Sequence, residues 1–333
     1  MTDPAIDPGA APAAASAPAQ AGKTVSRNQW WDVWDQFRAH KGAMAGAFVF
    51  LSIVFLVMFG SLVYPVSATH VPQGREFLEL KDTRPIYTAL WDSTAKVNWA
   101  HPLGTDQLGR DTLARLMMGG RVSIAVGLVA MALSILIGTV VGVAAGYFKR
   151  LDGPLMRFTD LVLALPLLPL ILVAVLLFRE ALNKTFGPEG GVFVLIVTLI
   201  GVTSWMQTAR IVRGDVLALK EREFVLAARS IGTSSNGMVT RHILPNVLSP
   251  IMVSATLGIA NAIITESALS FLGFGFPPDF PTWGRLLFDS VDRMVLYPER
   301  VLWPGLLISF TVLAVNYVGD GLRDALDPRI RGR

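Results

Sequence analysis

Residues that could carry out catalysis are sparse in this sequence of 333 residues. There is no cysteine, which excludes disulfides, iron–sulfur clusters and thiolate zinc sites. The four histidines lie far apart, and none forms a metal-ligand pair at helical spacing: His40, His70, His101 and His242. No Gly-x-Ser-x-Gly motif supplies a nucleophile. The sequence therefore predicts neither a catalytic centre nor a metal site, and an enzyme is the weakest of the functions considered.

One glycine-rich stretch, residues 104–111, has the spacing of a phosphate-binding loop but not its chemistry. Arg110 stands where the phosphate-contacting lysine belongs. Asp111 replaces the magnesium-binding hydroxyl, and its carboxylate would repel phosphate. A turn in which Thr105 or Asp106 caps the following helix is the favoured interpretation. The sequence has no other candidate phosphate loop. If the function of this protein requires ATP hydrolysis, another chain must therefore carry it out.

The composition and the apolar stretches of the sequence are those of a chain that crosses a membrane several times. Hydrophobic residues make up 52% of the sequence and charged residues only 16%. The net charge of +4 comes without a basic stripe with interleaved aromatic residues, so nucleic acid is not an expected partner. Six apolar stretches are long enough to cross a bilayer as helices: residues 43–64, 122–148, 158–178, 192–212, 247–272 and 301–318.

The distribution of basic residues favours cytoplasmic termini. An even number of spans places both termini on one side, and an excess of Lys and Arg marks the cytoplasm. With the termini inside, 17 of the 29 Lys and Arg residues are cytoplasmic. The remaining segments are then a disordered cytoplasmic tail (1–27), an interfacial amphipathic helix (28–42), two external loops (65–121 and 273–300), a cytoplasmic loop (213–246) and a cytoplasmic tail (319–333).

The polar segment between the fourth and fifth spans has the pattern of two helices. Residues 215–231 contain no Gly or Pro, and their apolar residues recur at helical spacing. Gly232 follows, where a helix commonly ends in a left-handed residue. Residues 233–236 offer caps for a second helix, which Pro245 is expected to end. Two interpretations remain open from this pattern: a docking surface for another protein, and a connector between two spans.

This segment resembles the EAA loop of importer-type ABC permeases, which has two alanines, a glycine four residues later and then Leu-Pro. The same spacing is met by Ala227, Ala228, Gly232, Leu244 and Pro245. In that family the loop forms the coupling helix that sits in a groove of the ATP-binding subunit. The acidic residue that usually precedes the alanines is Leu226 here, and Glu223 lies one turn earlier. The resemblance implies docking to the ATPase by Glu223, Ala227, Ala228, Arg229, Gly232, Leu244 and Pro245.

Three further stretches resemble the C-type permease subunit of dipeptide and oligopeptide importers. They are residues 101–111 (HPLGTDQLGRD), 267–283 (SALSFLGFGFPPDFPTW) and 316–329 (NYVGDGLRDALDPR). The resemblance implies an all-α polytopic membrane protein with six transmembrane helices, in the importer-type (MetI-like) ABC permease fold with a cytoplasmic coupling helix. It also implies a multi-pass protein of the bacterial inner membrane whose external loops are periplasmic.

The same resemblance implies the partners. These are a second, B-type permease subunit, two ATP-binding subunits, a periplasmic substrate-binding protein and membrane lipid. This chain is expected to hold no cofactor, because the ATP-binding subunits bind ATP and magnesium. The expected substrate is a dipeptide or oligopeptide; nickel, glutathione, an opine or an antibiotic peptide remain open.

Polar residues in the fifth span are candidates for the translocation pathway. Glu266 lies near Asn261 and Thr265, and an ionisable group at that depth should face water or protein rather than lipid. Either Asn261 and Glu266 line the pathway, or Glu266 is satisfied by a neighbouring helix. Glu266 is also the only intramembrane charge that would support the alternative function, an ion-coupled secondary transporter acting without an ATPase.

Glycines in the second span and prolines in the third span predict two local features of the membrane helices. Gly138, Gly142 and Gly146 share one face of the second span, for packing either within the subunit or against a partner permease. Pro166 and Pro169 interrupt the third span, as a bend facing the pathway or as a static kink.

Overall fold

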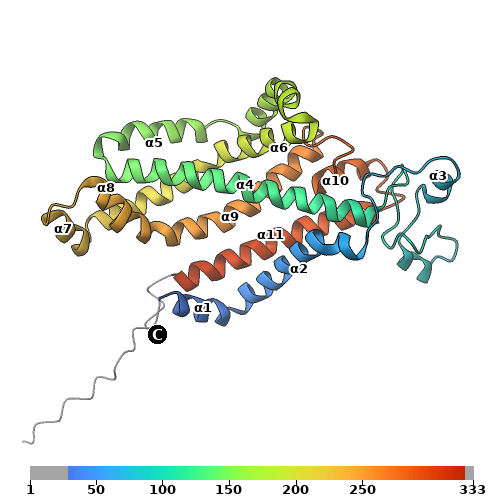
Figure 1. Ribbon diagram of the computed structural model, residues 1–333, viewed down its shortest axis with the longest axis horizontal. Helices are drawn as coiled ribbons and strands as arrows, with labels where there is room; N and C mark the ends of the chain where they lie inside the picture. The colour runs from blue at the N-terminus through green and yellow to red at the C-terminus, as the bar shows by residue number, and fades with distance from the viewer. Residues whose placement is uncertain (1–28, 327–333) are drawn as a thin grey trace, which may run out of the picture.

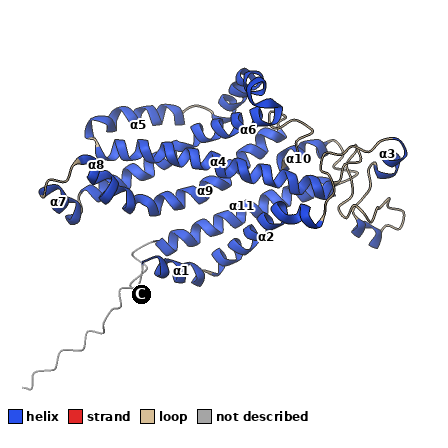
Figure 2. Ribbon diagram, viewed as in Figure 1, coloured by secondary structure: helices blue, strands red, loops and turns tan. Residues whose placement is uncertain are grey.

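The computed structural model of the chain describes residues 29–326, so the predicted tail at residues 1–27 and the last seven residues lie outside the described part. The helices are, in chain order, α1 (Gln29–Ala39), α2 (Lys41–Val63), α3 (Gly74–Leu80), the 3-10 helix η1 (Ile86–Leu90), α4 (Thr112–Tyr147), α5 (Lys149–Leu163), α6 (Leu167–Lys220), α7 (Glu223–Ser230), α8 (Ser235–Gly237), the π-helix η2 (Met238–Ile243), α9 (Leu244–Phe271), α10 (Trp283–Val291) and α11 (Glu299–Leu326). Figure 2 shows only helices and loops in this range. The all-α prediction is confirmed for the described residues.

The long helices lie side by side along the length of the molecule (Figure 1). α7 and α8 lie at one end, and α3 and α10 lie at the other with the loops around them. α1 and the C-terminal end of α11 point toward the α7 end. The molecule therefore has one end built from the segment between α6 and α9, and an opposite end built from the two predicted external loops.

Five helical segments of the described part are long and apolar enough to cross a membrane, where the sequence predicted six. The difference arises at the predicted third span, residues 158–178. α5 ends at Leu163 and α6 begins after Pro166, because Pro166 and Pro169 have no N–H to continue the hydrogen-bond ladder of α5. α6 then runs through the predicted fourth span as well, with one non-helical residue, Gly187 (φ 78°).

The start of α4 and the end of α11 also differ from the prediction. α4 starts at Thr112, well before residue 122, because the carboxylate of Asp111 accepts a hydrogen bond from the backbone N–H of Ala114 at 2.6 Å. The cap is therefore Asp111, and the predicted caps Thr105 and Asp106 were wrong. At the C-terminus α11 extends to Leu326, so the first part of the predicted tail is helical.

The glycine face of α4 packs inside the chain, against the second half of α6. A Cβ atom at Gly138 would lie 2.7 Å from the carbonyl oxygen of Trp205, and one at Gly142 would lie 2.6 Å from that of Ala209. Gly146 meets α6 in the same way. Side chains at these positions would push the two backbones apart, so packing within the subunit is the interpretation that holds.

Candidate functional site

The chain turns sharply at the end of α6, where the sequence predicted one helix over residues 215–231. α6 ends at Lys220, and α7 starts at Glu223. The turn allows Val225 and Ala228 to pack into a core with residues from the ends of α6, η2 and α9. This burial drives the chain out of the helical conformation, and no glycine or proline signals it in the sequence.

The turn after α7 and the start of the next helix follow the prediction more closely. Gly232 has φ +84°, the left-handed conformation predicted for it. The hydroxyl of Ser234 caps the next helix by accepting from the N–H of Gly237 at 3.3 Å, as expected of this polar stretch. Pro245 does not end that helix, which corrects the prediction. It lies in the first turn of α9, directly after the π-helix, where its missing N–H costs little.

α7 has an inner face and an outer face. Val225 is 0% exposed and Ala228 5% exposed, so Ala228 contacts its own subunit and is not available to a partner. The exposed residues of the helix include Glu223, Phe224, Leu226, Ala227 and Arg229. Phe224 and Leu226 expose 45% and 43% of their surface, and Ile231 exposes 84% directly after the helix. We call Phe224, Leu226, Ala227 and Ile231 the α7 apolar face.

Most of the α7 apolar face was not predicted from the sequence. Among the four residues of this face, only Ala227 was predicted to contact the ATPase. Part of the signal was present, because Leu226 and Ala227 fall between Val225 and Ala228 in the helical repeat and so point away from the face that these two residues bury. The predicted Leu244 and Pro245 are exposed as well, but on a different element, α9.

A cavity of about 490 Å³ lies between α5, α6 and α9. Gln207 reaches it from α6 and Asn261 from α9, and hydroxyl groups such as those of Thr203 and Thr265 add to its polar lining. Leu165, in the break between α5 and α6, also lines it. The break at Pro166 therefore borders a cavity. All the lining residues belong to the described part of the chain, and none of them has an ionisable side chain.

Glu266 is not among the residues that line this cavity, whereas Asn261 is. Its side chain is 0% exposed. The hydroxyl of Ser123 on α4 donates to one carboxylate oxygen at 3.0 Å, and that of Ser270 donates to the other at 2.8 Å. This is the alternative that the sequence left open, a buried carboxyl group satisfied by hydrogen bonds between α4 and α9.

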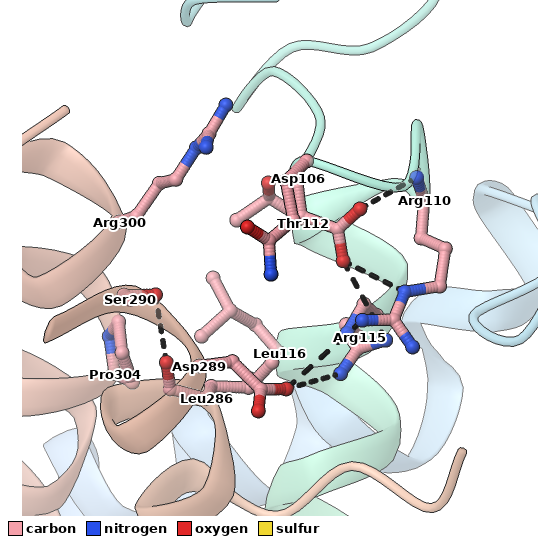
Figure 3. Close-up of a pocket in the computed structure, with 11 residues that line it drawn as sticks. Asp106, Arg110, Thr112, Arg115, Leu116, Leu286, Asp289, Ser290, Arg300 and Pro304 are labelled. Carbon is pink, nitrogen blue, oxygen red and sulfur yellow. Dashed lines mark hydrogen bonds and ion pairs between the residues drawn. The ribbon is translucent and has the colours of Figure 1, made fainter. Parts of the chain in front are cut away.

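A cluster of charged side chains closes the opposite end of the molecule (Figure 3). Arg115, only 1% exposed, lies 3.2 Å from a carboxylate oxygen of Asp289 on α10 and 3.7 Å from one of Asp106. The same oxygen of Asp106 accepts from Nε of Arg110 at 2.7 Å. The glycine-rich stretch 104–111 is thus a turn whose charges hold α4 against α10, in agreement with the rejection of a phosphate site.

Asp111 joins three elements at this end. Its carboxylate accepts from the hydroxyl of Tyr64 at 2.7 Å, and Nδ1 of His101 lies 2.7 Å from the same oxygen. Together with the cap of α4, these bonds fix the end of α2 to the start of α4.

The two predicted external loops are tied to one another as well. Asp82 in the first loop accepts from Arg293 and from Arg300 at 2.9 Å each, on either side of the α10–α11 connection. Nη2 of Arg84 donates to the carbonyl of Leu296 at 2.9 Å. The α3 and α10 end of the molecule is therefore held together as one folded unit, which the sequence did not predict for residues 65–100.

Comparisons with known proteins agree with this architecture. Residues 122–332 match the family described as "Binding-protein-dependent transport system inner membrane component". Residues 28–78 match the "N-terminal TM domain of oligopeptide transport permease C".

Individual relatives match over nearly their whole length. The oligopeptide transport system permease protein of Bacillus subtilis is 36% identical over 92% of this chain and 92% of the relative. The di/tripeptide transport system permease protein of Pseudomonas aeruginosa is 36% identical over 90% of this chain and 92% of the relative. The glutathione transport system permease protein of Pectobacterium atrosepticum is 34% identical, covering 94% and 95%.

Proposed function

This chain belongs to the family of binding-protein-dependent transport system inner membrane components, as an importer permease subunit, and we propose that its α7 couples a separate ATPase to the passage of peptides. A permease moves its substrate without converting it, so the chain is a membrane transport component and not an enzyme. We propose which surface of the chain binds the ATPase, which helices move with that surface and which substrates pass through the membrane.

We infer six membrane spans rather than five. The end of α5 from residue 158, with the first part of α6, would form the third span, and the part of α6 after Gly187 the fourth. With this count both termini, α1 and the segment around α7 share the cytoplasmic side. The arrangement in Figure 1 supports this, because α7 lies at the end toward which α1 and the end of α11 point. The excess of Lys and Arg on that side supports it independently.

The observation that carries the proposal is the α7 apolar face on a rigid base. Three apolar side chains exposed to water on a short helix, and a fourth directly after it, are costly unless a partner covers them. The inner face of the same helix is locked into a core with Val216 of α6 and Val247 of α9. Because packed cores transmit displacement rather than absorb it, a partner that moves α7 also moves the inner ends of α6 and α9.

α6 and α9 are also the helices that carry Gln207 and Asn261 into the cavity. A shift at α7 would therefore change the cavity wall directly. In the proposed cycle, two ATP-binding subunits close on ATP and magnesium, and one of them carries α7 along. The free energy of ATP binding then shifts the permease between inward-open and outward-open arrangements. A second permease subunit completes the pathway, and a periplasmic binding protein delivers the substrate.

Peptides are the proposed substrates. The relatives are named for oligopeptides, for di- and tripeptides and for glutathione, which is itself a peptide. The uncharged polar lining of the cavity supports this choice, because amide groups need hydrogen-bond partners and not opposite charges. A bare nickel ion would find no carboxylate, imidazole or thiolate among the lining residues.

The test truncates the α7 apolar face in the assembled importer. Replacing Phe224, Leu226 and Ile231 with Ala removes apolar contacts worth about 2–4 kcal/mol if half of each side chain is buried by the ATPase. We expect binding of the ATP-binding subunits to weaken about 30-fold to 900-fold. ATP-dependent uptake of trialanine into liposomes should fall with it.

The matched control truncates exposed apolar residues at the opposite end: Leu90, Trp91 and Trp99, which expose 83%, 70% and 77% of their surface. That variant should retain its ATP-binding subunits. If the α7 variant assembles and transports like the wild type, α7 is not the docking element.

A further inference from the structure

We propose that the break between α5 and α6, together with Gln207 and Asn261, forms a binding subsite for the backbone amide groups of a peptide. The inference rests on the proposed transport function and deepens it. It gives this chain a role in recognising the peptide within the membrane. The groups that do so contact the peptide backbone and do not distinguish one peptide side chain from another.

The break leaves backbone carbonyl groups without donors beside the cavity. The carbonyl of Leu165 cannot be paired by the usual donor four residues later, because that residue is Pro169. The carbonyl of Leu163, the last residue of α5, receives no backbone hydrogen bond in the described part of the chain either. Both residues line the cavity. In a membrane, unpaired backbone groups persist only where protein, water or a ligand can satisfy them.

Two carboxamide groups border the same cavity from other helices. Gln207 on α6 and Asn261 on α9 are both exposed within it, and neither side chain has a hydrogen-bond partner among the described residues. A carboxamide both donates and accepts, as a peptide bond does. The carbonyls of the break and the carboxamide oxygens can accept from peptide N–H groups, while the carboxamide NH2 groups can donate to peptide C=O groups.

The absence of ionisable side chains from the described lining sets the selectivity. A charged wall would favour peptides of opposite charge and repel the others, whereas hydrogen bonds to the peptide backbone hold any sequence equally. The cavity volume of about 490 Å³ lies in the range that takes small organic ligands. The subsite therefore suits short peptides with varied side chains, because it recognises the backbone amide groups that all of them share.

The experiment uses the complete reconstituted importer with its binding protein. ATP-driven uptake is measured for trialanine and for its ester isostere, in which an oxygen replaces the central N–H. The ratio of the two rates in each variant is divided by the wild-type ratio. This removes the discrimination made by the binding protein, which is the same protein in every assay.

Two variants change the subsite. Pro166→Ala with Pro169→Ala supplies the missing N–H groups, so that α5 can pair its own carbonyls. Gln207→Leu with Asn261→Leu removes the carboxamides. We expect each to lower the amide-over-ester preference about threefold to tenfold, the effect of losing one neutral hydrogen bond. The matched controls are Pro188→Ala and Asn316→Leu, a proline and an asparagine in helices α6 and α11 that do not line the cavity.

Each outcome is informative. A loss of preference in the two subsite variants, with the controls unchanged, supports the subsite. An unchanged preference in variants that still transport trialanine with ATP overturns it and leaves the transport function standing. A wild-type importer that transports neither compound with ATP would contradict the proposed function instead.

Discussion

Neighbouring alanines of α7 should respond in opposite ways to the same substitution. Ala228 is 5% exposed and packed in the core that joins α6, α7 and α9, whereas Ala227 is exposed on the outer face. Replacing Ala228 with Leu inserts three extra carbon atoms into a packed core, at a cost of about 1–3 kcal/mol. Replacing Ala227 with Leu in the isolated chain should change the free energy of unfolding by no more than about 0.5 kcal/mol.

The assay is thermal unfolding of the purified chain in detergent, alongside binding of the ATP-binding subunits. Ala228→Leu should lower the midpoint of unfolding, and its binding defect should follow from the loss of folded protein. Ala227→Leu should leave the midpoint unchanged and still weaken binding, because the larger side chain lies at the proposed contact. If Ala227→Leu destabilises the isolated chain as much as Ala228→Leu does, the orientation assigned to α7 is wrong.

Three further predictions concern the packing and charges that support the site. Gly142→Val should lower the stability of the chain by about 1–3 kcal/mol, because a Cβ would lie 2.6 Å from the carbonyl of Ala209; thermal unfolding in detergent measures this. Arg115→Met should cost about 1.5–3 kcal/mol, because Asp289 loses its hydrogen bond to a buried arginine although it keeps its ion pair with Arg285; the same assay measures this loss. Arg213 on α6 donates a hydrogen bond to Asp152 and lowers the pKa of that carboxyl group. The stability that this bond contributes at neutral pH is therefore lost as the pH falls below the ordinary aspartate pKa of about 3.9 and through the lowered pKa of Asp152. Melting curves of wild type and Asp152→Asn should therefore differ at pH 7 and converge in acid.

Much of the fold follows from local patterns in the sequence. Apolar length alone locates the five helical segments that are long enough to cross a membrane, and Gly232 and Ser234 mark the turn after α7 because their backbone requirements are local. The glycines of α4 predict a close helix contact by their spacing. Their partner, the second half of α6, is a matter of tertiary packing that one sequence does not reveal.

Contacts distant in sequence account for several of the differences between prediction and structure. Burial of Val225 and Ala228 broke the predicted long helix at the end of α6. A serine on α4, far from the fifth span in sequence, donates a hydrogen bond to Glu266, which is the second of the two alternatives left open for this residue. The cap of α4 moved to Asp111, which also receives the hydroxyl of Tyr64.

The central claim is that the outer face of α7 contacts the ATP-binding subunit, and a crosslink tests it most directly. The chain has no cysteine, so Leu226→Cys introduces a single thiol on that face. A photoreactive maleimide attached there in the assembled complex should form a covalent product with the ATP-binding subunit, whereas the same probe on Trp91→Cys at the opposite end should not. An intact complex in which the probe at Leu226→Cys never reaches the ATP-binding subunit would contradict the account.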